Sequence, residues 1–142
     1  MRVQMFFDDL LGLTTASHIH CCAPVGSNAG VASQLPTFSG FPSGVTSGTY
    51  DQTFDMTLAS SYNAAFITAH GGTTAGAFAD LFGGMLDGNA YLNIHTSQFG
   101  GGEIRGQLAA IPEPSTWAMM LVGFGVGYSW GATLIRWDAT AA

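Results

Sequence analysis

"NAYLNIHTSQFGGGEIRGQL", residues 89–108, is the stretch that decides the fold of this 142-residue chain. Leu92 and Ile94 are expected to face the core, while the residues around them face outward: Tyr91, Asn93 and His95. This period of two predicts a half-buried strand. The alternation resumes after three consecutive glycines, with Ile104 and Leu108 expected on the inward face. Because glycines suit a tight turn, the stretch predicts a hairpin of two antiparallel strands.

Two other stretches are also predicted to be extended. "TYDQTFDMTL", residues 49–58, alternates in the same way, and "TASHIHC", residues 15–21, reads as a further strand. Residues 23–47 are rich in Gly, Pro, Ser and Thr, which indicates a long ordered loop or an edge excursion. The sequence therefore predicts a mainly β domain.

A short helical insertion interrupts the strands. In residues 75–90 the large apolar side chains recur at helical spacing, and Gly88 is expected to end this helix. These apolar residues are Phe78, Leu81, Phe82 and Met85. Residues 60–72 predict a shorter helical turn with Ser60 or Ser61 as its N-cap and Gly71 as its end.

The charge of the chain is small and acidic. Charged residues make up 8% of the sequence, no lysine occurs, and the formal net charge is -6. Nucleic-acid binding is therefore not expected, because no basic patch is available to neutralise phosphates. A surface of Ser, Thr, Asn, Gln and Gly is typical of extracellular β proteins.

The two ends of the chain differ from its polar body. No charged residue occurs from Trp117 to Ile135, and this length is enough for a membrane span. We therefore expect four parts: a β domain (1–109), a linker (110–116), an apolar transmembrane or sorting helix (117–136) and a tail (137–142). At the other end, Asp8 and Asp9 interrupt the apolar run, so no signal peptide is predicted in this chain.

Three stretches together resemble the CHRD (chordin-type) domain: residues 15–31, residues 41–57 and residues 89–108. The last is the most specific, since it joins Asn-x-His-Thr, a glycine hairpin and Gly-Glu-Ile-Arg-Gly-Gln. The resemblance implies an antiparallel β-sandwich with the Greek-key order of copper/zinc superoxide dismutase, and no enzymatic activity. The early strands of the family find no counterpart before Phe6.

The tail, "IPEPSTWAMMLVGFGVG", resembles a PEP-CTERM sorting signal, with Pro112, Glu113 and Pro114 as its motif. The signal is degenerate, because Arg136 stands alone where a cluster of arginines is normal. The resemblance implies processing by an exosortase, transient residence in the inner membrane, and delivery to the surface or extracellular matrix of a Gram-negative bacterium.

Four histidines are candidate metal ligands. His18 and His20 lie on one face of their strand, because side chains repeat every two residues. His95 can converge with them from another strand, and His70 lies on a loop as a further candidate. Imidazole suits copper and zinc. The alternative is a structural role in which these histidines hydrogen-bond to loops and no cofactor is bound.

Two further pairs of residues carry distinctive chemistry. Cys21 and Cys22 are adjacent, and three states stay open for them: a buried and an exposed thiol, a vicinal disulfide, or soft ligands that supplement the histidines. Glu103 and Arg105 share one strand face and resemble the Glu-x-Arg pair of the family. They are expected to be a structural pair, in which Arg105 binds Glu103 or an aspartate across the strand; the alternative is that the two residues grip a partner carboxylate.

Two functions are compatible with these features. The first is a non-enzymatic surface or matrix module that acts in adhesion or scaffolding, with exopolysaccharide or surface proteins as partners. The second is a copper- or zinc-binding protein similar to superoxide dismutase, built on the His-x-His pair.

Overall fold

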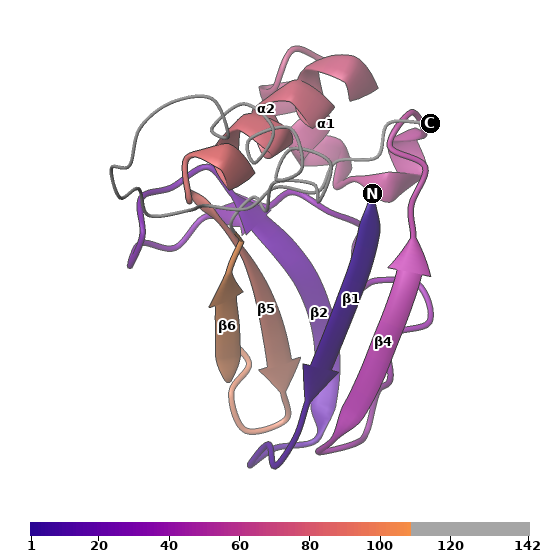
Figure 1. The fold of residues 1–142 in the computed structure, drawn as a ribbon, viewed down its shortest axis with the longest axis vertical. Helices are drawn as coiled ribbons and strands as arrows, with labels where there is room; N and C mark the ends of the chain where they lie inside the picture. Colours follow the sequence, from indigo (N-terminus) through magenta and orange to yellow (C-terminus); the bar gives the residue numbers. More distant parts are fainter. Residues whose placement is uncertain (109–142) are drawn as a thin grey trace, which may run out of the picture. The chain divides into compact units, whose positions relative to one another are not determined.

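The computed structural model describes residues 1–108, which form a mainly β unit with two antiparallel sheets and two short α-helices (Figure 1). The PEP motif, the apolar segment and the tail expected between residues 110 and 142 lie outside the described residues. Across residues 1–108, no helix has the length and apolar character that crossing a membrane requires.

The larger sheet has four strands in the order β3-β2-β5-β6. The two central strands are β2 (Thr14–Cys21) and β5 (Ala90–Thr96), which run antiparallel. At the edges lie β3 (Gly30–Val31) and β6 (Ile104–Gln107). The strands predicted around the two histidine stretches are therefore confirmed, including the hairpin between β5 and β6.

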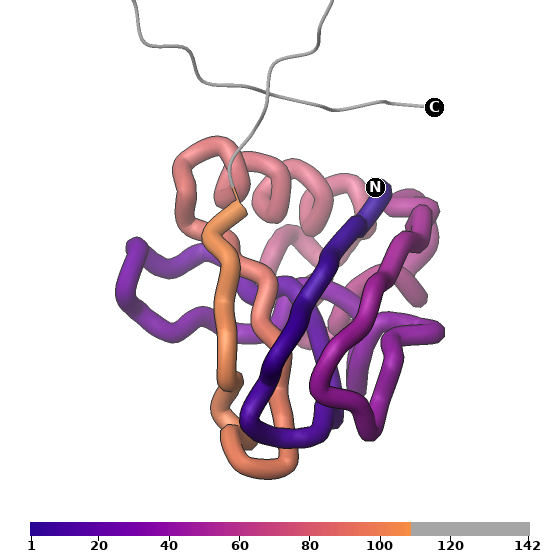
Figure 2. The backbone as a smooth tube through the Cα atoms, turned by 60° about the horizontal axis from the view of Figure 1, so that its bottom comes forward, coloured from indigo at the N-terminus to yellow at the C-terminus, as the bar shows by residue number. Residues whose placement is uncertain are grey.

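The smaller sheet pairs β1 (Arg2–Phe7) with β4 (Gly48–Thr53), which lie side by side in Figures 1 and 2. Its first strand was not predicted from the sequence. Val3 and Phe7 are buried on the face that carries Met5, while the residues between them are more exposed. The alternation of buried and exposed residues is short and ends beside two aspartates, so the local sequence does not indicate a strand. The segment becomes a strand because it pairs with β4.

The side chains of both sheets and of the helices meet in one hydrophobic core. The largest fully buried side chain is that of Phe38, which comes from the segment between β3 and β4. The core also contains residues from each sheet and from the second helix: Val3, Phe7, Ile19, Tyr50, Leu81 and Ile94.

The strand predicted over residues 49–58 is shorter in the structure, because β4 ends at Thr53. The side chain of Asp55 accepts hydrogen bonds from both the backbone N–H and the hydroxyl of Thr57, at 2.9 and 2.6 Å. This local turn competes with the strand. Leu58, the last residue of the predicted strand, therefore lies outside β4 and is 53% exposed.

The first helix, α1 (Ala64–Ala69), starts later than predicted. Its N-cap is Asn63, whose side chain accepts a hydrogen bond from the backbone N–H of Ala65. Ser60 and Ser61, the predicted caps, belong instead to the preceding 3₁₀ turn Ala59–Ser61. Asparagine caps a helix as well as serine does, so composition alone did not select between them.

The second helix, α2 (Thr74–Leu86), matches the prediction closely. Thr73 caps it by accepting a hydrogen bond from the backbone N–H of Gly76. Gly88 ends it with a φ of 69°, a conformation that favours glycine. On β6, Ile104 lies opposite the core residue Ile94 and therefore on the predicted inward face. It is nevertheless 43% exposed, because β6 is a short strand at the edge of the sheet.

Candidate metal centre

Strands β2 and β5 bring three of the four candidate histidines together. In the register of the two strands, His18 lies opposite Asn93 and Ala16 lies opposite His95. His18, His20 and His95 therefore share the outward face of the sheet, away from the core residue Ile19. The ring centroid of His18 lies 5.2 Å from that of His20 and 4.6 Å from that of His95.

One ring nitrogen from each of these histidines forms a compact set, with all three atoms within 4.8 Å of one another. Zinc binds imidazole nitrogen at about 2.0–2.1 Å, so the nitrogens of one tetrahedral ion are roughly 3.3 Å apart. The separations between these nitrogens therefore need to shorten by up to about 1.5 Å to hold one ion, a movement that small side-chain rotations can supply.

Two backbone carbonyls fix which nitrogens are available. Nδ1 of His20 lies 2.8 Å from the carbonyl oxygen of Ala29, and Nδ1 of His95 lies 2.9 Å from that of Gly100. A carbonyl can only accept, so in both rings Nδ1 donates its proton and the neutral ring keeps a lone pair on Nε2. This is the arrangement in which outer hydrogen bonds orient histidine ligands at metal sites.

The remaining buried nitrogens have no hydrogen-bond partner among residues 1–108. They are Nδ1 of His18, Nε2 of His20 and Nε2 of His95. A buried polar atom without a partner costs about 1–3 kcal/mol. Three such atoms at one place therefore destabilise the folded protein unusually strongly, and one cation bound between them would offset this cost.

The protonation of His18 and His20 favours metal binding at neutral pH. The pKa of His18 is lowered to about 4, mainly by burial and also by the neighbouring rings of His20 and His95. Burial is also the main cause of the lowered pKa of His20. The hydrogen bond to the Ala29 carbonyl acts to raise this pKa, while His95 and Arg105 lower it further. Neutral imidazole is the form that binds metals.

Tyr91 and Arg105 support this site, and sequence reasoning gave them no such role. The ring of Tyr91 stacks on His20 at a centroid distance of 4.8 Å, and the Arg105 guanidinium lies 4.3 Å from the Tyr91 centroid. The Tyr91 hydroxyl also accepts a hydrogen bond from the backbone N–H of Ala29. The loop that carries the Ala29 carbonyl is thus held over the histidines.

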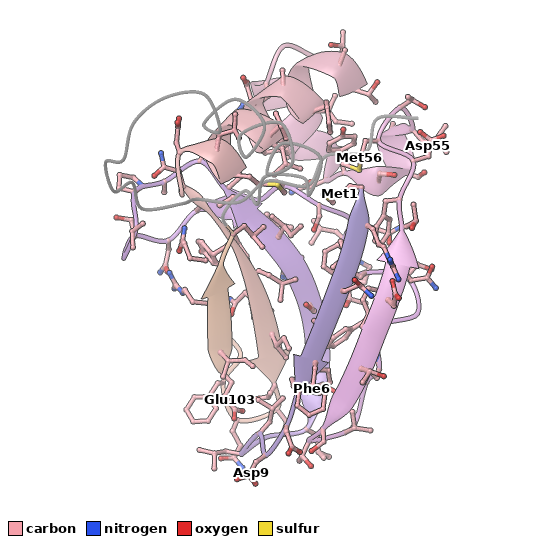
Figure 3. The ribbon with its side chains drawn as sticks, in the orientation of Figure 1. Met1, Phe6, Asp9, Asp55, Met56 and Glu103 are labelled. Atoms are coloured by element: carbon pink, nitrogen blue, oxygen red, sulfur yellow. A yellow bond between two sulfur atoms is a disulfide. The ribbon has the colours of Figure 1, made fainter. Side chains whose placement is uncertain are left out.

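The predicted pair of Glu103 and Arg105 is not formed, because each residue takes other partners. Arg105 donates to the carbonyl of Ser27 and to Oδ1 of Asn28. Glu103 accepts hydrogen bonds from three groups: the backbone N–H of Leu11, that of Gly12, and the Thr96 hydroxyl. Figure 3 shows Glu103 at the same end of the molecule as Phe6 and Asp9.

The structure separates the other candidate residues from the histidine cluster. His70 pairs with Asp80, with Nδ1 of the ring 2.7 Å from Oδ2 of the carboxylate. Cys21 and Cys22 form a disulfide with each other. Of the three states that the sequence left open, the structure therefore contains the vicinal disulfide, and the sulfurs are not part of the histidine set.

Two antiparallel sheets with a cluster of three histidines on an outward sheet face define a β domain with a candidate metal site. The chain belongs to the CHRD domain family, whose model matches residues 1–108. No curated protein and no solved structure matches the chain.

Proposed function

We propose that this domain binds one copper or zinc ion through His18, His20 and His95. The observation that carries the proposal is the set of three buried ring nitrogens without partners among the described residues. The carbonyls of Ala29 and Gly100 orient two of the rings so that their lone pairs are free. Three imidazoles are a ligand set that suits both metals.

Calorimetric titration of the metal-free full chain with Zn²⁺, and separately with Cu²⁺, tests this proposal. We expect one ion per chain. His18→Ala and His20→Ala should each weaken binding by more than the ~10- to 100-fold that loss of an outer hydrogen-bond partner costs. His70→Ala is the matched control, because His70 is paired with Asp80 outside the cluster. Equal, weak binding by all four proteins would contradict the proposal.

We propose a binding role and no enzymatic activity for this site. Three protein ligands would leave one position of a tetrahedral ion open, as in catalytic zinc sites. The three ring nitrogens are buried, however, and this restricts the access of a substrate to an ion held between them. A dismutase-like activity is the alternative. It would appear as superoxide dismutation by the copper-loaded chain that exceeds the rate of the equally loaded His18→Ala variant; we expect no such difference.

A second proposal is that the protein is an exported, non-enzymatic surface or matrix module that acts in adhesion or scaffolding. The specific observation in its favour is the Cys21–Cys22 disulfide, because disulfides persist mainly in oxidising compartments. Exopolysaccharide or surface proteins would be its partners. Under this proposal an exosortase-type enzyme processes the segment around Pro112, Glu113 and Pro114 while the chain resides transiently in the inner membrane.

Export and processing are tested in a Gram-negative bacterium that has an exosortase. The full chain is expressed behind a secretory leader with an epitope tag at its C-terminus. We expect the tag to be removed and the domain to be found at the cell surface, while Glu113→Ala keeps the tag. Retention of the tag by both chains would contradict the proposed sorting.

We also propose that the two sheets are the layers of a β-sandwich with the Greek-key order implied by the resemblance to copper/zinc superoxide dismutase. Support comes from the single core shared by both sheets and from the non-sequential order β3-β2-β5-β6. A crystal structure would test the strand connections directly.

A further inference from the structure

We propose that the Cys21–Cys22 disulfide is a site of thiol–disulfide exchange, opened by a dithiol reductant that attacks the sulfur of Cys22. The proposal is independent of the metal site, because it rests on other residues and a different chemistry. It begins from the unequal positions of the two sulfurs. Cys22 is exposed, whereas Cys21 belongs to the core with 6% of its surface exposed.

The exposed residue Cys22 lies in the wall of a cavity. This open cavity of about 290 Å³ is lined by Cys22, His70, Asp87, Asn89 and one side of α2, including Asp80. The ion pair between His70 and Asp80 fixes part of the wall. A small dithiol can therefore enter beside Cys22, whereas Cys21 is a buried residue of the core.

A stabilising role explains this disulfide poorly. In the chain-entropy account a disulfide stabilises by restricting the unfolded chain, and the effect grows with the length of the loop it closes. A bond between neighbours closes the shortest loop a chain allows. The backbone at Cys22 is also held without it, because its N–H donates to the carbonyl of Asn89 at 3.0 Å.

The surroundings can accept the reduced form. The sulfurs of Cys21 and Cys22 lie 3.9 and 3.7 Å from the backbone carbonyl oxygen of Asp80. A disulfide sulfur carries no proton, so in the oxidised protein these are contacts only. After reduction either thiol can donate its proton to that carbonyl, so the reduced pair gains a hydrogen-bond partner in place.

The exchange then runs in two balanced steps. A thiolate of the reductant bonds to the sulfur of Cys22, the bond between the two cysteine sulfurs breaks, and Cys21 leaves as a thiolate that takes a proton from solvent. The second thiolate of the reductant attacks the reductant's other sulfur in this mixed disulfide, and Cys22 leaves as a thiolate that takes a proton from solvent. Two electrons pass to the protein, and the dithiol leaves as a disulfide.

Reduction of the native full chain by dithiothreitol, with chelator present to exclude metal, is the first test. We expect two alkylatable thiols per chain by mass spectrometry, while far-UV and near-UV circular dichroism stay those of the folded protein. In the folded state Cys22 has a φ of 83°, a region that side chains rarely adopt. Release of the bond therefore leaves room for local relaxation. Reduction that occurs only in denaturant would overturn the proposal.

Two single variants test the direction of attack. Cys21→Ser leaves the exposed thiol alone and Cys22→Ser leaves the buried one. We expect oxidised glutathione to modify the thiol of Cys21→Ser at least about tenfold faster than that of Cys22→Ser, because access controls the rate of thiol exchange. In denaturant the two rates should become equal, which controls for intrinsic reactivity. Equal rates in the folded variants, each shown by circular dichroism to be folded, would overturn the proposal.

Discussion

At the scale of the residue, His18 links the metal site to the stability of the domain. The residue is 7% exposed, and mainly through burial its pKa is lowered to about 4 from an ordinary value of 6.5. The folded protein therefore keeps this ring neutral at pH values where the unfolded chain protonates it. Such a difference in proton binding makes stability depend on pH.

We predict that the metal-free protein loses stability as pH falls from 6.5 to 4. The pKa of His18 is lower in the folded state, so the unfolded state binds more protons in this window and stability rises with pH. The shift corresponds to roughly 3 kcal/mol at most. Urea unfolding of the wild type and of His18→Gln in chelator measures it. The variant should show a shallower decline; identical pH profiles would contradict the assignment.

Glu103 acts at the same scale as a connector between distant segments. Its carboxylate binds the backbone N–H groups of Leu11 and Gly12, which precede β2, and the hydroxyl of Thr96 at the end of β5. Partial burial works to raise the pKa of Glu103, but these hydrogen bonds outweigh it and hold the pKa below its ordinary value.

We expect Glu103→Gln to lower the midpoint of thermal unfolding, because the amide can accept through only one of its two polar atoms. Asp9→Asn is the matched control. Asp9 adopts a φ of 55°, where asparagine is well tolerated, and this change removes a carboxylate from the same end of the molecule. Equal midpoints for the two variants would show that the contacts of Glu103 contribute nothing specific.

At the scale of the element, two neighbouring glycines of α2 have different surroundings. A Cβ placed on Gly84 would collide with the sulfur of Cys21 and press on that of Cys22, whereas one placed on Gly83 meets nothing within 4 Å. The helix therefore needs Gly84 to approach β2 closely. It gains nothing comparable from Gly83, since glycine costs a helix about 1 kcal/mol relative to alanine.

We predict opposite effects for these two positions. Gly83→Ala should raise the free energy of unfolding by about 1 kcal/mol, through helix propensity alone. Gly84→Ala should lower it by about 1–3 kcal/mol, because overpacking outweighs that gain. Chemical denaturation of both variants gives the comparison, and stabilisation by Gly84→Ala would show that helix and disulfide do not pack as described.

The elements themselves were predictable where a period was sustained. Strand β5 and helix α2 combine a clear alternation or helical spacing with a glycine stop, and both were predicted with nearly correct ends. Strand β1 and the end of β4 were missed for a physical reason. The first depends on pairing with a distant partner, and the second on a turn that the side chain of Asp55 forms with Thr57.

At the scale of the whole molecule, a long connection supplies the centre of the core. Phe38 lies in the segment between β3 and β4, yet it is only 1% exposed. Its ring lies 5.3 Å from that of Phe54 and 5.9 Å from that of Tyr50, centroid to centroid. Local composition reads this segment as a loop, and only the assembled fold shows that it fills the interior.

We predict that Phe38→Ala lowers the free energy of unfolding by about 3–5 kcal/mol, through lost burial and the cavity that remains. Phe6→Ala is the control, because Phe6 is 74% exposed and surface changes are usually within about 0.5 kcal/mol. Urea unfolding of both variants measures the difference. Similar losses would place Phe38 outside the core.

The sequence predicted which histidines come together in the candidate site, but not the groups that hydrogen-bond to them. The His-x-His pair on one strand face, and the convergence of His95 with it, followed from the period of a strand. The partners of the rings did not, because the carbonyls of Ala29 and Gly100 belong to loops and every residue has a carbonyl. Separating His70 from the cluster likewise needed the packing of α2, where Asp80 binds it.

The two faces of β2 have separate tasks, since Ile19 packs in the interior while His18 and His20 point the other way. Replacing the imidazoles would leave the apolar, core-facing side of that strand unchanged. A domain built like this can gain or forfeit an ion without redesigning its scaffold.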